Sequence, residues 1–173
     1  FEELPDLLEW ADVLCIGCGL GMGPHSEELL KKVLENNKTP AVIDADGLNL
    51  LAKTDEWGIE QIRMNPSGYV LTPHMKEMSR LTRWSIDTIM EDRFQALDQI
   101  IKQSGPDTKS SIICVLKDSR TVVAQTNRQR FVNLAGNNSM AKGGSGDVLA
   151  VRDSAKPAGG TRRPRPGSPH RPF

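Results

Sequence analysis

Apolar residues along the chain fall into short continuous runs, each followed closely by glycine, proline or a charged residue. The four clearest runs are residues 12–16, 41–44, 69–72 and 111–116. Runs of this length predict strands, and the last is apolar enough to be covered on both faces. Two further segments, 121–125 and 130–134, predict a hairpin joined by the polar residues 126–129.

The segments between these runs carry apolar residues at helical spacing. A helix is predicted to begin at Ser26, whose hydroxyl can cap free backbone amides, and to close at residues 36–37. After a turn at Asp46-Gly47, a short helix is expected to end at Leu51. Helices are also predicted over 75–81 and, as one long element, over 85–103. Strands that alternate with helices indicate an α/β fold, with a mainly parallel sheet and helices on both sides.

Composition places the chain among globular proteins. It has 173 residues, of which 38% are hydrophobic and 25% charged, so it is of one-domain size and can bury a core. It has no run of eighteen apolar residues, which argues against a membrane-spanning helix. Because the chain begins at Phe1 without a basic-then-apolar leader, we expect its start to lie inside a longer protein located in the cytoplasm.

Residues 151–173 differ from the rest of the chain. They hold five Arg, one Lys and one Asp, a net charge of +5 against −5 for residues 1–150, together with five of the eleven prolines. Without apolar periodicity, they are expected to form a disordered tail behind a partial domain spanning 1–150. We interpret the abrupt change as a frameshift or a misjoined segment. A nucleic-acid arm is disfavoured, because no aromatic residues are interleaved with the basic ones.

The cysteines do not predict a metal or redox centre. Cys15 and Cys18 have the spacing of a redox pair, but they follow a strand and lie among glycines instead of opening a helix. A zinc site needs about four ligands, and the sequence offers no second Cys or His pair. We expect Cys15, Cys18 and Cys114 to be structural or incidental.

Polar clusters follow each of the four main strands. They are residues 17–23, 44–46, 72–74 and 117. Ligands of α/β sheets bind at the carboxyl ends of strands, so these clusters predict one site. Three of them also have a plainer interpretation: His74 as a surface residue, Asp44 as a strand end with Asp46 as a turn or helix cap, and 117–121 as a hairpin turn.

The strongest chemical signal is the segment 141–150, with glycines at 143, 144 and 146 followed by Asp147. Closely spaced glycines let a backbone approach a ligand, and a helix that begins there would direct free amides at a phosphate. Asp147 would then suit a proton acceptor or a magnesium-bound group. A flexible loop with a capping Asp is the alternative. The segment has no Walker A spacing, and residues 17–23 lack that of a dinucleotide fingerprint.

Taken together, these segments resemble the ADP-dependent NAD(P)H-hydrate dehydratases of the ribokinase-like superfamily. The resemblance rests on Cys15-Ile-Gly-Cys-Gly-Leu-Gly21, Val42-Ile-Asp-Ala-Asp-Gly-Leu-Asn49, Val70-Leu-Thr-Pro-His74, Leu116-Lys117 to Thr121, and Met140-Ala-Lys-Gly-Gly-Ser-Gly-Asp-Val-Leu149. It covers about residues 10–150. It implies a three-layer ribokinase-like fold that is incomplete at both ends.

The resemblance also implies a reaction and a set of site residues. ADP or ATP with Mg²⁺ would phosphorylate the hydroxyl of hydrated NADH or NADPH, and loss of phosphate would restore the double bond. Asp147 would be the catalytic base and would contact the substrate together with Gly19, Gly21 and His74. The implied nucleotide-binding residues are Lys117, Asp118, Ser119, Arg120, Thr121, Asn137, Met140, Gly143, Gly144, Ser145 and Gly146.

Two positions depart from the family pattern, and several alternatives stay open. Cys18 stands where proline is usual, and Asp118 stands where glycine is common, which puts a negative charge beside Lys117. A ribokinase-like vitamin kinase or an inactive fragment are the competing functions. Homo-oligomerisation and a fused or partner epimerase domain are left open, whereas nucleic-acid and membrane partners are not expected. We predict poor stability for this exact polypeptide.

Overall fold

The structure, a computed structural model, describes residues 1–102, 111–126 and 130–133. Six strands and seven helices occur in these residues. The strands are β1 (Leu14–Ile16), β2 (Ala41–Ile43), β3 (Tyr69–Leu71), β4 (Ile112–Leu116), β5 (Val122–Gln125) and β6 (Phe131–Val132). The helices are α1 (Leu4–Trp10), α2 (Pro24–Asn36), α3 (Asp46–Lys53), α4 (Asp55–Met64), α5 (Met75–Thr82), α6 (Ile86–Glu91) and α7 (Arg93–Ile101).

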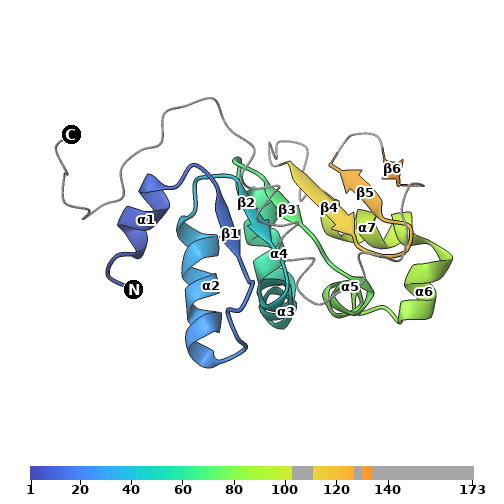
Figure 1. Cartoon of the computed structure of the whole chain (residues 1–173), viewed down its shortest axis with the longest axis horizontal. Helices are drawn as coiled ribbons and strands as arrows, with labels where there is room; N and C mark the ends of the chain where they lie inside the picture. Colours follow the sequence, from blue (N-terminus) through green and yellow to red (C-terminus); the bar gives the residue numbers. More distant parts are fainter. Residues whose placement is uncertain (103–110, 127–129, 134–173) are drawn as a thin grey trace, which may run out of the picture.

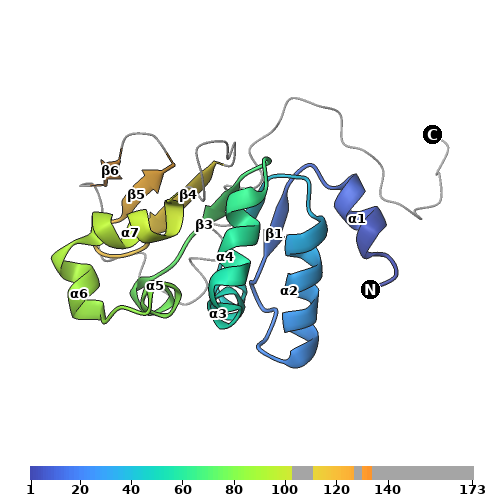
Figure 2. The same cartoon turned by 180° about the vertical axis from the view of Figure 1, so that it is seen from behind.

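The strands form one sheet in the order in which they occur along the chain. β1 to β4 are parallel, and β5 and β6 are antiparallel to their neighbours. Figure 1 shows this order from β1 on one side of the molecule to β6 on the other, and Figure 2 shows it from behind. The mainly parallel sheet and the β4–β5–β6 hairpins confirm the predicted α/β class.

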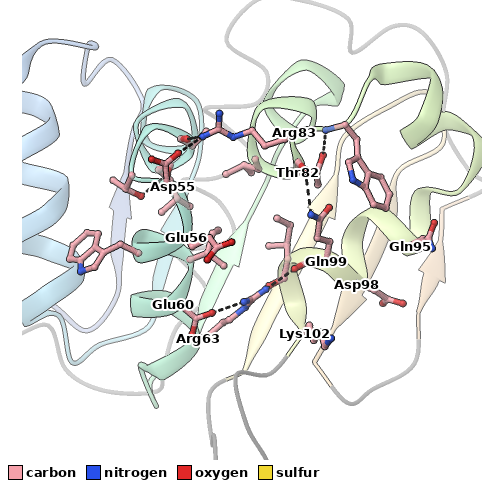
Figure 3. A pocket seen from close by; sticks show the side chains of 18 residues that line it. Asp55, Glu56, Glu60, Arg63, Thr82, Arg83, Gln95, Asp98, Gln99 and Lys102 are labelled. Atoms are coloured by element: carbon pink, nitrogen blue, oxygen red, sulfur yellow. Dashed lines mark hydrogen bonds and ion pairs between the residues drawn. The ribbon is translucent and has the colours of Figure 1, made fainter.

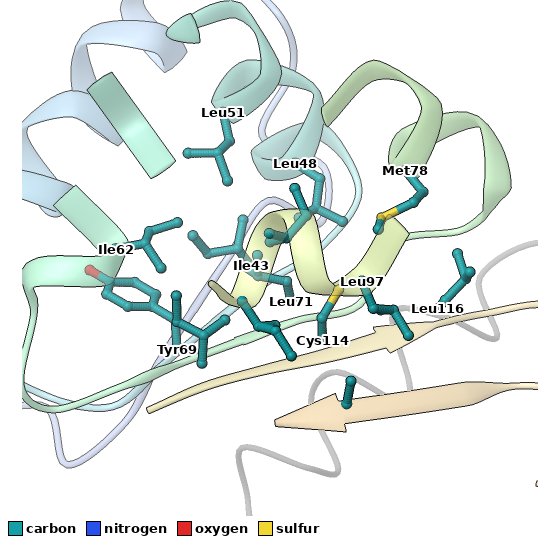
Figure 4. Packing of buried hydrophobic residues seen from close by; sticks show 14 of the residues in the cluster. Ile43, Leu48, Leu51, Ile62, Tyr69, Leu71, Met78, Leu97, Cys114 and Leu116 are labelled. Carbon is teal, nitrogen blue, oxygen red and sulfur yellow. The ribbon is translucent and has the colours of Figure 1, made fainter. Parts of the chain in front are cut away.

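Helices cover one face of the sheet within the described residues. Each crossover from β1 to β4 moves to the next strand in the same direction, and right-handed crossovers of that kind put their helices on one face. The burial pattern agrees, because Leu71, Cys114 and Leu116 are buried while Val70 and Ile113, which alternate with them, are only half-buried. Figure 4 shows helices on one side of β4 and β5, with the buried side chains between them.

The core between the sheet and this helix layer is built from aliphatic side chains. Ile43, Leu71 and Leu116 come from the strands, and Leu48 and Leu97 from the helices; all are fully buried. Burying such a side chain contributes roughly 1.5–3 kcal/mol to folding. This core fixes the strands in register, and the strand register positions the strand ends.

Two predictions of helix boundaries were wrong. The element expected over 85–103 is two helices, because the Asp92 carboxylate accepts a hydrogen bond from the Gln95 amide and starts α7 anew. The second helix of the chain begins at Pro24, and Ser26 does not cap it. Its hydroxyl donates to the Leu20 carbonyl instead, at 2.8 Å.

Helices α1 and α4 were not predicted, and α3 begins directly at Asp46, where a turn was expected. The helix over 75–81 and the closing of α2 at residues 36–37 are confirmed. No helix in the described part of the chain is long and apolar enough to cross a membrane.

Candidate active site at the strand ends

The carboxyl ends of β2 and β4 are joined by an ion pair that passes over the end of β3. Lys117 Nζ lies 2.7 Å from Asp44 Oδ1. The Asp44 residue is 1% exposed, and the Lys117 side chain is 21% exposed. A carboxylate this deeply buried needs a partner charge. The pair therefore joins two of the four predicted polar clusters, residues 44–46 and residue 117.

The two carboxylates of the segment from Asp44 to Asp46 contact different parts of the site. Asp44 Oδ1 also accepts a hydrogen bond from the Ala45 amide at 2.8 Å, and Ala45 has a φ of 48°. Asp46 Oδ2 accepts a hydrogen bond from the Gly21 amide at 2.8 Å. Ala45 lies between the two aspartates in the chain, and its positive φ is unusual for a residue other than glycine. Asp46 thereby fixes the glycine loop after β1.

Close packing accounts for the first glycine of that loop. Gly17 has a φ of 126°, and a Cβ at this position would lie 1.8 Å from the Asp44 carbonyl oxygen. Only glycine fits such an approach. The loop therefore lies directly against the end of β2, as the predicted site requires.

His74 starts the helix that follows β3. Its Nδ1 accepts hydrogen bonds from the amides of Lys76 and Glu77, and the Glu77 carboxylate accepts one from the His74 amide at 2.8 Å. Because Nδ1 is an acceptor, the cap requires an imidazole without a proton on that nitrogen, which leaves Nε2 as the donor. Nε2 lies 3.3 Å from Glu77 Oε1. The ring is thus oriented, while half of the side chain stays exposed.

Glu77 is a buried acid beneath this histidine. Burial raises the pKa of its carboxyl group, as does the nearby charge of Asp44, whereas the hydrogen bond from the His74 backbone and the charge of Lys117 lower it. Its side chain is only 5% exposed. A buried carboxyl that contacts a half-exposed imidazole can exchange a proton with it. Sequence reasoning missed Glu77; the signal available was its position three residues after a strand-end His.

The main chain also joins β3 to β4 at this edge. The Lys117 amide donates to the Pro73 carbonyl at 2.7 Å, and His74 and Lys117 form a parallel bridge. Thr72 Oγ1 is buried and has no hydrogen-bond partner within the described residues. A buried hydroxyl of this kind is an available donor at the site.

The β4–β5 turn contains the candidate nucleotide contacts. Lys117 begins it, Ser119 and Arg120 are exposed, and the Thr121 hydroxyl lies 3.4 Å from the Asp118 carbonyl oxygen. The side chain of Asp118 is turned toward α7, where its carboxylate lies 2.9 Å from Arg93 Nη2.

Arg93 therefore neutralises the negative charge of Asp118, the residue that stands where glycine is common in the family. Its Nε is buried and has no hydrogen-bond partner among the described residues. Sequence reasoning did not single out Arg93, because only the folded chain brings it next to Asp118. The negative charge of Asp118 faces the arginine, so it does not oppose an anion at Lys117.

Several predicted site residues lie outside the described residues. They are Asn137, Met140, Gly143, Gly144, Ser145, Gly146 and Asp147. Within the described part, no three His, Cys, Asp or Glu side chains are grouped to hold a metal ion. Asp44 and Asp46 are engaged by Lys117 and by backbone amides. These carboxylates therefore do not form a magnesium site by themselves.

The three cysteines differ in their exposure. Cys114 is buried in the core, and burial raises the pKa of its thiol, which disfavours the reactive thiolate. Cys15 and Cys18 are exposed. Their surroundings among the described residues contain no metal-ligand cluster.

An α/β sheet with a polar site at the carboxyl ends of its parallel strands defines the class of protein. The structure matches a ribokinase-like superfamily protein of Enterococcus faecalis with a TM-score of 0.68 and 29% identity, over 85% of this chain and 47% of that one. It also matches the ADP/ATP-dependent NAD(P)H-hydrate dehydratase of Bacillus subtilis co-crystallised with ATP/Mg²⁺ and soaked with CoA, with a TM-score of 0.59 and 25% identity, over 80% of this chain and 46% of that one. The fold is that of the ribokinase-like superfamily.

Within that class, the chain belongs to the NAD(P)H-hydrate dehydratase family, whose model matches residues 2–151. A bifunctional NAD(P)H-hydrate repair enzyme of Coxiella burnetii is 38% identical over 149 residues, which are 86% of this chain and 28% of that protein. An ADP-dependent (S)-NAD(P)H-hydrate dehydratase of Neisseria meningitidis is 35% identical over 78% of this chain and 43% of its own length. The chain thus spans less than half of these relatives.

Proposed function

We propose that the protein takes part in the ADP- or ATP-dependent dehydration of hydrated NADH or NADPH. Transfer of a phosphoryl group to the hydrate hydroxyl would turn a poor leaving group into a good one. The C–O bond then breaks with phosphate as the leaving group, and loss of a proton from the neighbouring carbon restores the double bond. The chemistry named for the family and its relatives supports this assignment.

The observation that supports the proposal most is the convergence of four strand ends. The glycine loop, Asp46, His74 and the Asp44–Lys117 pair lie at one edge of the sheet. A damaged nicotinamide would lie against Gly19 and Gly21, with the half-exposed imidazole of His74 beside it. An oriented, half-exposed imidazole can contact a hydroxyl or amide group of the substrate.

The nucleotide would lie toward the β4–β5 turn. In this proposal Lys117 to Thr121 contact ADP or ATP, and the Arg93–Asp118 pair fixes the turn. Gly143 to Gly146 cradle the transferred phosphoryl group, Asn137 and Met140 shape the nucleotide pocket, and Asp147 accepts the proton of the hydroxyl. Mg²⁺, when bound with the nucleotide, would neutralise charge on its phosphates. The cytoplasmic location and the pairing with an epimerase domain remain predictions.

The test is recovery of NADH or NADPH absorbance from the purified hydrates on addition of ADP or ATP. We expect turnover that depends on the nucleotide, and at least a hundredfold loss in Asp147→Asn, in line with the loss of a general base. Asp87→Asn, which removes an exposed carboxylate at the start of α6, is the control and should keep full activity. A stable phosphorylated product without elimination would instead indicate a kinase. Absence of turnover with either nucleotide would contradict the proposal.

A further inference from the structure

A cavity of about 770 Å³ is lined by residues of α3, of α5 and of the segment that follows α5. Met22, from the loop after β1, lies at one side of it, and Asn49 and Lys53 line it from α3. Arg80 lines it from α5, and the indole of Trp84 forms a further wall. The cavity is therefore built from the same loop and the same two helices that leave the strand-end site.

Two cations in this cavity have no carboxylate partner within the described residues. Lys53 Nζ donates to the Met22 carbonyl at 3.4 Å, and Arg80 Nη1 donates to Asn49 Oδ1 at 2.6 Å. Both partners are uncharged oxygens. A third cation at the rim, Arg83, is instead paired with Asp55. The cavity thus carries two uncompensated positive charges, which is the electrostatic setting of an anion site.

The cavity lies within reach of the strand ends. Arg80 is six residues along α5 from His74, which at 1.5 Å per residue is about 9 Å. Lys53 is seven residues along α3 from Asp46, or about 10 Å. A dinucleotide whose reacting ring contacts His74 is therefore long enough to reach both cations.

We infer that this cavity, defined by Lys53, Arg80 and Trp84, binds the phosphate-bearing adenosine half of a dinucleotide. The inference rests on the proposed function, which places the nicotinamide at the strand ends. Arg80 can present a planar guanidinium to a phosphate, and Lys53 adds a second charge. The Trp84 indole offers an apolar surface to adenine, since base stacking on aromatic rings is favourable. The groups that bind are either the pyrophosphate or a phosphate on the ribose.

The larger groove on the same side of the molecule does not offer this chemistry. It has a volume of about 1090 Å³ and lies between α4 and α7, as Figure 3 shows. The guanidinium of Arg63 is already bonded to Glu60 and to the carbonyls of Gln99 and Ile100. Asp98, which also lines the groove, is paired with Arg130. The arginines of this groove, Arg63 and Arg83, are thus already paired with carboxylates, whereas Lys53 and Arg80 are not, so the smaller cavity is the site that fits phosphate.

The experiment measures binding of NAD⁺ and NADP⁺ by calorimetry to the full chain and to Lys53→Gln, Arg80→Gln and the double variant. We expect each single variant to weaken binding about tenfold, as the loss of one charge-assisted contact would. Lys38→Gln is the matched control, because Lys38 is exposed and precedes β2 at the opposite edge of the sheet. It should leave both affinities unchanged, and thermal unfolding should show all variants folded like the wild type.

The pattern over the two probes identifies the phosphate. If the variants lose affinity equally for NAD⁺ and NADP⁺, the cations bind the pyrophosphate. If they lose affinity for NADP⁺ alone, the cations bind the ribose phosphate. Unchanged affinity in the folded double variant overturns the inference.

If the wild type binds NADP⁺ through these residues but does not turn over the hydrates, the inference stands and the proposed function fails. If it turns over the hydrates and the double variant keeps the wild-type KM, the function stands and the inference fails. A wild type that neither binds nor turns over overturns both.

Discussion

The ammonium group of Lys117 lies 2.7 Å from the carboxylate of Asp44, although the two residues are 73 positions apart in the chain. The contact reaches from the end of β4 to the end of β2 and so encloses the end of β3 between them. The ion pair thereby adds a side-chain link to the main-chain hydrogen bonds that join the parallel strands at the edge where the candidate active site lies. Its removal should affect folding as well as binding.

Replacing Asp44 with Asn should lower the free energy of unfolding by about 2 kcal/mol, because it leaves a half-buried lysine without its partner charge. Urea denaturation monitored by circular dichroism measures this. Glu28→Gln breaks the ion pair of α2 with Lys32, whose side chains are 55% and 42% exposed, and should change nothing measurable. Equal midpoints for Asp44→Asn and the wild type would refute a structural role for the pair.

Gly17→Ala should destabilise the protein by roughly 3 kcal/mol, since the new methyl group would overlap the Asp44 carbonyl and the backbone keeps a positive φ. Gly19→Ala separates the two causes. Gly19 also has a positive φ, of 70°, but a Cβ there would meet no atom within 4 Å. Gly19→Ala should therefore lower the free energy of unfolding by only about 1 kcal/mol. Similar losses in both variants would show that backbone strain alone matters.

Stability should fall as the pH rises through the titration of Glu77. Burial raises the pKa of this carboxyl above its ordinary value of about 4.5. Between the unfolded and folded pKa values the native state binds more protons than the unfolded state, so the free energy of unfolding decreases across that window. Above the folded pKa this contribution stays lost.

The measurement is thermal unfolding at a series of pH values from 4 upward, about the unperturbed carboxyl pKa. Glu77→Gln imitates the protonated acid and should remove this slope, while its side-chain carbonyl can still accept the His74 amide. Glu35→Gln, at an exposed position of α2, should retain the wild-type slope. A slope that persists in Glu77→Gln must arise from another group.

Asp92→Ala should cost about 1 kcal/mol, the usual contribution of an N-cap side chain. The substitution removes the acceptor for the Gln95 amide and with it the signal that starts α7. Asp87→Ala, in the first turn of α6, removes a carboxylate without removing a cap and should cost less. Chemical denaturation of the two variants compares them directly.

These elements show how far the sequence alone could reach. The four main strands were predictable because their apolar runs are buried and end at glycine, proline or charge. The two helices over 86–91 and 93–101 were not separated, because the apolar periodicity continues across Asp92 while the cap acts only locally. Helix α4 was missed because only Gly58 and Ile62 of its residues are buried, so its apolar pattern is weak.

The candidate site likewise has a part that the sequence predicted and a part that it did not. The rule that ligands bind at the carboxyl ends of strands placed Gly21, Asp46, His74 and Lys117 at one edge. Which side chains pair there depends on tertiary structure. The Asp44–Lys117 and Arg93–Asp118 contacts join segments that no local pattern connects. The cation cavity was likewise invisible, because Lys53 and Arg80 look like ordinary exposed helix residues in the sequence.

The assembly of this edge from four distant segments has a practical consequence for ligand screening. A molecule that binds across the strand ends has no such site to bind in the unfolded chain, so it must raise the melting temperature by an amount that grows with the logarithm of its concentration divided by its Kd. Thermal-shift assays can therefore rank nucleotides and nicotinamide compounds even in preparations without turnover.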